Sequence, residues 1–181
     1  MNVQVTSRPL PAPANTSKLA TADCDIHPQR SNDKALHPYL EQRWIEHMQT
    51  FGARPRQAYQ KGPAYPKGQP NASRRDAYPP EGGRQGSSLS FMQQQHLDAN
   101  NVTLGILNPL KSGQGLSNPG LAAAMCRAVN EWQVAEWTSK DSRLKASVVV
   151  ANEDGQAAAA EIRKRAGDAN FVQVLLLSRN V

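Results

Sequence analysis

ASVVV at residues 146–150 and VQVLLL at residues 172–177 are the stretches that decide the fold class of this chain. Each is short and almost continuously apolar, as a β-strand covered on both faces must be. A third apolar stretch, VTLGIL, precedes them at residues 102–107. Helical patterns separate the three stretches, and an alternation of strands and helices predicts an α/β fold with parallel strand pairing.

The helices between these strands have recognisable ends. Asn118 followed by Pro119 predicts an N-cap and the first turn of one helix. Its buried stripe is expected to consist of apolar residues at helical spacing, namely Leu121, Met125, Ala128, Val129 and Trp132. Asn152 is expected to cap the next helix, which Gly167 ends, and the last strand is expected over Phe171–Leu177.

Two more helices and one more strand are predicted in the N-terminal half. Leu19–His27 is expected to be the first strand. Ala35–Phe51 predicts a helix, because its apolar residues recur every four positions and Pro38 falls in the first turn. Ser90 is expected to cap a further helix over Phe91–Ala99.

Two segments lack such periodicity. Residues 1–17 carry three prolines and small polar residues and predict a flexible leader. Residues 52–89 are rich in proline and glycine and predict a long irregular loop, with seven basic and two acidic residues between Arg54 and Arg84. Tyrosines interleave with these cations, yet no pattern typical of nucleic-acid binding surrounds them, so nucleic acid is not the expected partner. The basic loop favours a small anionic molecule.

The composition of the chain indicates which broad class of protein it belongs to. Its 181 residues, net charge of +6 and mean hydropathy of −0.62 suit one soluble domain. No apolar run reaches the roughly 20 residues that cross a bilayer, and the N-terminus lacks the apolar region of a signal peptide. We therefore expect a cytoplasmic protein without a membrane partner. Cys24 and Cys126 are expected to be reduced core residues. The oligomeric state stays open.

The first predicted strand carries a possible metal-binding pair. Asp25 and His27 are separated by one residue, so alternation along a strand points both side chains the same way. A carboxylate and an imidazole suit Zn²⁺ or a similar divalent ion, although a zinc site needs about three or four protein ligands. The alternative is a carboxylate that accepts loop N–H groups beside a hydrogen-bonded histidine. Cys24 alternates to the opposite face, which indicates packing.

Several stretches together resemble the amidohydrolase-related branch of the amidohydrolase superfamily, which includes metal-dependent decarboxylases similar to aminocarboxymuconate semialdehyde decarboxylase. The stretches are Asp23–His27, Pro38–Trp44, Asn108–Pro109, Ala128–Trp132 and Arg143–Leu144. The resemblance implies a (β/α)₈ barrel with a divalent metal ion at the carboxyl ends of its strands. It extends over residues from about 18 to 181, the length of about four of the eight β/α units, and so indicates the N-terminal half of such a barrel.

The resemblance also implies roles for particular residues. Asp25 and His27 stand where family members commonly have His-x-His, so they are the expected metal ligands, with Zn as the expected ion and Mn as a second possibility. Asn108 and Arg179 follow the second and fourth strands, where barrel enzymes place substrate contacts. Their alternatives are a loop asparagine ahead of a proline and an arginine at a frayed terminus. No catalytic residue is expected within this chain, because the family's other ligands lie on later strands.

Two functions therefore stay open. The first is a metal-dependent hydrolase or non-oxidative decarboxylase that acts on a small substrate bearing a carboxylate, with the 181-residue chain inactive alone. The second is a small open α/β domain that is not an enzyme and that binds an anionic partner through its basic loop.

Overall fold

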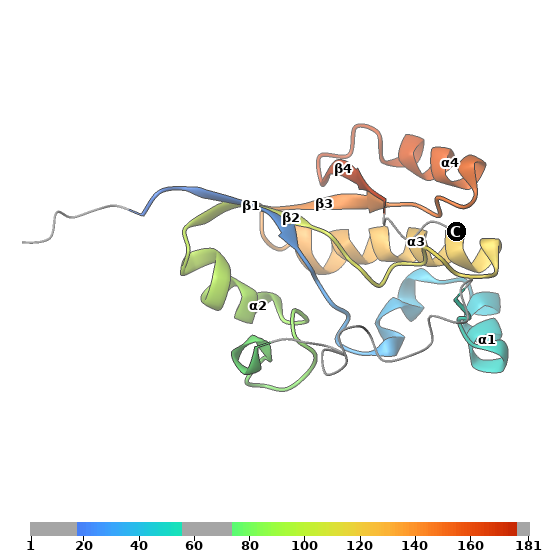
Figure 1. Cartoon of the computed structure of the whole chain (residues 1–181), viewed down its shortest axis with the longest axis horizontal. Coiled ribbons are helices and arrows are strands. Elements are labelled where there is room, and N and C mark those ends of the chain that lie inside the picture. The colour runs from blue at the N-terminus through green and yellow to red at the C-terminus, as the bar shows by residue number, and fades with distance from the viewer. Residues whose placement is uncertain (1–17, 56–73, 177–181) are drawn as a thin grey trace, which may run out of the picture.

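The sheet consists of four parallel strands in the order β1-β2-β3-β4 (Figure 1). The computed structural model describes residues 18–55 and 74–176. The strands are β1 (Thr21–Ile26), β2 (Val102–Leu107), β3 (Leu144–Val149) and β4 (Phe171–Leu175). Strands that follow one another in sequence are neighbours in the sheet, and helices connect them. The predicted α/β class with parallel pairing is confirmed.

The two helices that follow β2 and β3 begin at side-chain caps. α3 (Pro119–Gln133) is capped by Asn118, whose Oδ1 accepts the N–H of Leu121 at 3.0 Å, as predicted, and it runs on into the π-helical turn η5 (Val134–Thr138). α4 (Gly155–Arg165) is capped by Asp154, whose side chain accepts the N–H groups of Gln156 and Ala157. The prediction of Asn152 as this cap was wrong.

The helix predicted over Ala35–Phe51 is divided. The 3₁₀ helix η1 (Asp33–Tyr39) contains Pro38, and α1 (Gln42–Phe51) follows it. Leu40 between them is extended, with φ −110° and ψ 142°. Because proline removes a backbone donor and disfavours helical geometry in the residue before it, the chain turns here through a short 3₁₀ helix.

The helix before β2 begins earlier than predicted. Ser88 is the cap of α2 (Leu89–Met92), since its Oγ accepts the N–H of Phe91 at 3.3 Å, and Ser90 bonds to Ser88 instead of capping the helix. The π-helical turn η4 (Gln93–Asp98) continues α2. Between α1 and α2 the structure describes residues 52–55 and 74–88 of the basic loop, and in these residues there is a single short 3₁₀ helix, η3 (Arg75–Ala77).

The apolar core lies where α3 packs against the sheet (Figure 1). Its fully buried residues include Leu107, Val129, Leu144 and Trp137, each at most 2% exposed. A Cβ atom on Gly105 in β2 would lie 2.7 Å from Ile26 Cδ1 and 2.9 Å from a Leu144 side-chain carbon. Glycine at this position therefore lets the side chains of the two neighbouring strands close over β2.

The outer strands are exposed, contrary to prediction. β3 is buried along almost its whole length, but β1 buries only Ile26 fully, and Cys24 is exposed. Val172 and Val174 in β4 are 53% and 39% exposed. Among the described residues, β1 and β4 each pair with one strand only, so their apolar residues lack a neighbour on one side. The predictions that the last strand is covered on both faces, and that Cys24 packs in the core, were therefore wrong. Within residues 18–55 and 74–176, no helix is long and apolar enough to cross a membrane.

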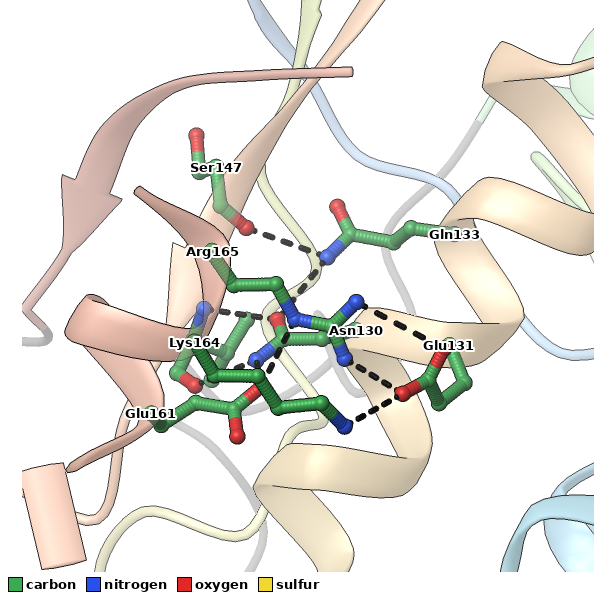
Figure 2. A network of polar contacts seen from close by, with 8 residues as sticks. Asn130, Glu131, Gln133, Ser147, Glu161, Lys164 and Arg165 are labelled. Carbon is green, nitrogen blue, oxygen red and sulfur yellow. Dashed lines mark hydrogen bonds and ion pairs between the residues drawn. The ribbon is translucent and has the colours of Figure 1, made fainter. Parts of the chain in front are cut away.

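A buried polar network joins β3, α3 and α4 (Figure 2). The Asn130 side chain accepts the N–H of Val149 at 2.8 Å and donates to the Val149 carbonyl at 2.9 Å and to Glu161 Oε1 at 2.9 Å. Gln133 Nε2 donates to the Ser147 carbonyl at 3.0 Å. Asn130 thus acts toward Val149 as another strand would, and it links that strand to α4.

The α4 end of the network carries the charges. Arg165 donates to Glu161 Oε1 at 2.9 Å and to Glu131 Oε1 at 2.7 Å, and the side chains of Glu161 and Arg165 are only 5% and 7% exposed. Lys164 also donates to Glu131, at 2.8 Å. Burial by itself raises the pKa of the Glu131 carboxyl, but the hydrogen bonds from Lys164 and Arg165 outweigh it and hold that pKa below its ordinary value.

A second ion-pair cluster ties η4 to the beginning of β3. Asp141 accepts hydrogen bonds from the guanidinium and backbone N–H of Arg143 and from Gln93 Nε2 at 2.9 Å. Arg143 also donates to Asp98 at 2.7 Å. The Arg143 side chain, with help from Gln93 and against the opposing influence of burial, lowers the pKa of Asp141 from 3.8 to about 2.

This cluster predicts a pH-dependent stability. Because the folded state favours the charged form of Asp141, its contribution is complete above about pH 4 and is lost as the pH falls toward 2. We expect Asp141→Asn to lower the free energy of unfolding by about 1–2 kcal/mol at pH 7, and the difference from wild type to shrink between pH 4 and pH 2. Urea unfolding at several pH values measures both effects. Asp98→Asn removes the exposed partner of Arg143 and should cost less; a pH-independent effect of Asp141→Asn contradicts the assignment.

Candidate metal and substrate site

A bulge in β1 directs the carboxylates of Asp23 and Asp25 to different partners. Asp23 pairs with Gly105 of β2 and Ile26 pairs with Leu107, so three residues of β1 span two residues of its neighbour. Asp23 Oδ2 accordingly meets His96 Nε2 of η4 at 2.7 Å, whereas Asp25 meets Asn108, just beyond the end of β2. The bulge leaves Asp25 apart from the Asp23–His96 pair.

Asp25, His27 and Asn108 come together at the carboxyl ends of β1 and β2. Asn108 Nδ2 donates to Asp25 Oδ1 at 2.9 Å, and the backbone carbonyl of Asn108 lies 2.9 Å from His27 Nδ1. The remaining polar atoms of the pair, Asp25 Oδ2 and His27 Nε2, face each other at 3.6 Å. Their side chains are 72% and 42% exposed, so both are open to solvent on this face.

The contact with a carbonyl fixes the position of one proton on the histidine ring. A carbonyl oxygen only accepts hydrogen bonds, so His27 Nδ1 must carry a proton and donate it to Asn108. In the neutral imidazole, Nε2 then has a free lone pair directed toward Asp25 Oδ2. A metal-binding histidine typically has this arrangement, with one nitrogen held by a carbonyl and the other available to the ion.

Asn108 is the organising residue of the site. It is 6% exposed, and its Nδ2 donates to the Cys24 carbonyl at 3.0 Å as well as to Asp25. Its Oδ1 accepts hydrogen bonds from Ser147 Oγ at 2.6 Å and from Gln173 Nε2 at 3.2 Å. From its place just after β2, the side chain therefore connects residues on β1, β3 and β4, and each of its two amide atoms has two partners.

The donor pair fits a divalent cation. Zinc lies roughly 2.0–2.2 Å from nitrogen and carboxylate oxygen ligands, so two ligand atoms 3.6 Å apart can both reach one ion. Nε2 and Oδ2 both present lone pairs, and a cation between them removes their repulsion. In the described ranges, no group of three or more His, Cys, Asp or Glu residues could hold a metal ion, so only this pair of side chains is available to an ion at these strand ends among the described residues.

A cavity of about 100 Å³ adjoins His27. Its lining brings the segment after β1 together with the segment after β2 and with α3. The basic side chains in it are Arg30, Arg84 and Lys111, and Trp132 and Val129 of α3 belong to its apolar part.

The structure brings together three of the four predicted site residues. Asp25, His27 and Asn108 are brought together, whereas Arg179 lies outside the described residues, as do residues 1–17 and residues 56–73 of the basic loop. Sequence reasoning missed Ser147 and Gln173. A signal was present, since each is a single polar residue within an otherwise apolar strand, as in ASVVV and VQVLLL.

Known proteins resemble this chain in sequence pattern and in fold. The amidohydrolase family model matches residues 22–180. The crystal structure of 2,6-dihydroxybenzoate decarboxylase from Rhizobium is similar, with a TM-score of 0.51 and 15% sequence identity, and the alignment covers 87% of this chain and 38% of that one. No curated protein matches the sequence.

These findings confirm the expected fold class. Four parallel strands joined by helices form the first half of a TIM barrel, and they carry the candidate site at the strands' carboxyl ends, where such barrels hold their active sites. Proteins of this family usually bind a divalent metal ion. With the family model matching almost the whole of the described sequence, this chain belongs to the amidohydrolase family.

Proposed function

We propose that the protein is a metal-dependent hydrolase or non-oxidative decarboxylase for a small substrate bearing a carboxylate, and that Asp25 and His27 are two of its metal ligands. The observation that carries this proposal is the pair of facing atoms, Asp25 Oδ2 and His27 Nε2, at 3.6 Å. Zn is the expected ion and Mn the second candidate, because a nitrogen and a carboxylate oxygen suit both. The family match supports the same class of chemistry.

The residues of this chain have distinct tasks in the proposal. Asn108 holds the Asp25 carboxylate through its amide and the His27 ring through its carbonyl, so both ligands are oriented before any ion arrives. A bound divalent ion supplies Lewis-acid chemistry that polarises a substrate oxygen. Since the described residues offer two ligands, further ligands and the groups that transfer protons would have to come from outside residues 18–55 and 74–176.

The proposal predicts that His27 is required for metal uptake. His27→Ala removes one of two donors, and we expect the affinity of the 181-residue chain for Zn²⁺ or Mn²⁺ to fall at least about 100-fold, more than the 10–100-fold typical of losing a residue that only orients a ligand. Competition with a chromogenic chelator measures this affinity. His37→Ala, on η1 and outside the site, is the matched control and should bind as wild type.

The two results of the metal-uptake experiment lead to different conclusions. Loss of metal uptake in His27→Ala with normal uptake in His37→Ala supports ligation by His27. Equal uptake in wild type and both variants contradicts it, and the Asp25–His27 pair is then a hydrogen-bonding feature of the strand end.

A further inference from the structure

The cavity beside His27 has an unusual charge balance. Three cations, Arg30, Arg84 and Lys111, belong to its lining, and no acidic residue does. Arg84 is paired with the exposed carboxylate of Asp33, at 2.9 Å. Arg30 and Lys111 have no carboxylate within ion-pair distance among residues 18–55 and 74–176. The positive charge of the cavity is therefore only partly neutralised by the chain itself.

Arg30 is the most informative of the three cations. It is half-buried, and no hydrogen bond joins its guanidinium to another described residue. Burial lowers the pKa of this guanidinium below its ordinary value, against the raising influence of Asp33, and Arg84 adds to the lowering. A guanidinium removed from water and left without an anion is costly, and a carboxylate that binds its fork of N–H donors offsets that cost.

Apart from His27 and Gln29, the rest of the lining is apolar. It consists of Pro28, Pro109, Leu110, Val129 and Trp132. Such a combination, a few charged groups set in an apolar wall, is how small-molecule sites fix the orientation of a ligand that has one charged end.

We infer that this cavity binds the carboxylate of a small molecule whose remaining part is apolar, with Arg30 as the anchor and Lys111 and Arg84 as supporting cations. The inference deepens the proposed function, on which it rests for the role of the ligand as substrate: it names a monocarboxylate with an apolar body and places its charged end next to His27. Arg30 then determines specificity for anions and takes no part in holding the metal.

Benzoate and benzamide are suitable probes, since they share an apolar ring and differ in charge. Metal-free protein, prepared by dialysis against a chelator, is titrated with each and followed by amide chemical shifts. We expect benzoate to bind with at least about a tenfold preference over benzamide, because a hydrogen bond to a charged group contributes about 1.5–3 kcal/mol. Shifts should concentrate at residues 27, 29–30, 84, 110–111 and 129–132.

Variants identify the anchor. Arg30→Met should abolish the preference for benzoate, while Arg30→Lys keeps the charge, loses the two-pronged geometry and should retain part of the preference. Lys111→Met should weaken benzoate binding by a smaller factor. Arg163→Met, on α4 and outside the cavity, makes the same substitution on an exposed surface and should leave benzoate binding unchanged. Thermal melting of each variant shows whether it is folded.

The readout does not depend on the metal, so the two proposals fail separately. Absence of benzoate binding to metal-free wild type, or equal binding by folded wild type and Arg30→Met, overturns the carboxylate site whatever the metal experiment gives. Benzoate binding that depends on Arg30, together with unchanged metal uptake in His27→Ala, upholds the anion site and overturns the proposed metal ligation.

Discussion

Asn108→Leu is expected to destabilise the protein by about 1–3 kcal/mol and to disorder the Asp25–His27 pair. Leucine has nearly the shape of asparagine, but it removes the donor to the Cys24 carbonyl and the acceptor of Ser147 Oγ and Gln173 Nε2, which keep only their hydrogen bond to each other at 3.0 Å. Ser147 is fully buried, and a buried polar group that loses a partner costs about 1–3 kcal/mol. Urea unfolding gives the loss of stability, and the chelator competition gives the loss of metal affinity that follows from a mobile Asp25.

Two further variants show which half of the amide matters. Ser147→Ala removes one donor to Asn108 Oδ1 and leaves Gln173 in place, so we expect a loss of about 1 kcal/mol and nearly normal metal uptake. Asn108→Asp keeps the acceptor and loses the donor to Cys24 and Asp25, and it sets a second negative charge beside the Asp25 carboxylate. It should therefore be less stable than Ser147→Ala. If all three variants have wild-type stability, Asn108 does not organise the site.

The strand pattern was predictable because it depends on local sequence. Three apolar stretches and the Leu19–His27 segment gave four parallel strands, and the Asn118–Pro119 cap was found where expected. The first residue of a helix was predicted wrongly where two residues suited to capping lie within three positions of each other, as Asn152 and Asp154 do. Both residue types cap well, so propensity does not choose between them. The choice depends on a tertiary contact: Glu153 between them accepts the N–H of Gly115 at 2.7 Å, and the helix begins just after it.

Burial of the outer strands could not be read from the sequence. An apolar stretch shows that a strand is suited to a covered position, but it does not show which element covers it. β3 has a neighbour on each side and is buried, whereas β4, with similar apolarity, has one described neighbour and exposes Val172 and Val174. The corresponding error at β1 put Cys24 in the core.

The candidate site was predictable only in its local part. The one-residue spacing of Asp25 and His27 was enough to bring them together. Asn108 was predicted as a substrate contact, which stays a prediction, and its hydrogen bond to Asp25 was not foreseen. Ser147 and Gln173 reach Asn108 through the order and register of β2, β3 and β4, including a register shift between Ala146 and Ser147. Contacts of this kind follow from the assembled sheet, and no sequence spacing encodes them.

Arg165→Met is expected to cost about 3–5 kcal/mol, which is typical of breaking a buried ion pair by removing one partner. The Glu161 carboxylate, 5% exposed, would keep Asn130 Nδ2 as a donor but lose its cation. The substitution also removes the guanidinium that lies 5.1 Å from the centre of the Phe171 ring. Because β4 begins at Phe171, we expect α4 and β4 to loosen together, and hydrogen exchange of their amides reports this directly.

The double variant Glu161→Leu, Arg165→Met tests whether charge burial is the cause. If the unpaired Glu161 carboxylate causes the loss of stability in Arg165→Met, removing that carboxylate as well should recover at least about half of the lost free energy of unfolding. An apolar pair often replaces a buried ion pair at little cost. Lys164→Met supplies the exposed comparison: Lys164 is 53% exposed and bonds only to Glu131, so its loss should stay below about 1 kcal/mol. A double variant as unstable as Arg165→Met alone would instead assign the loss to packing around Phe171, with the Glu161–Arg165 pair contributing to the position of α4 and little to its stability.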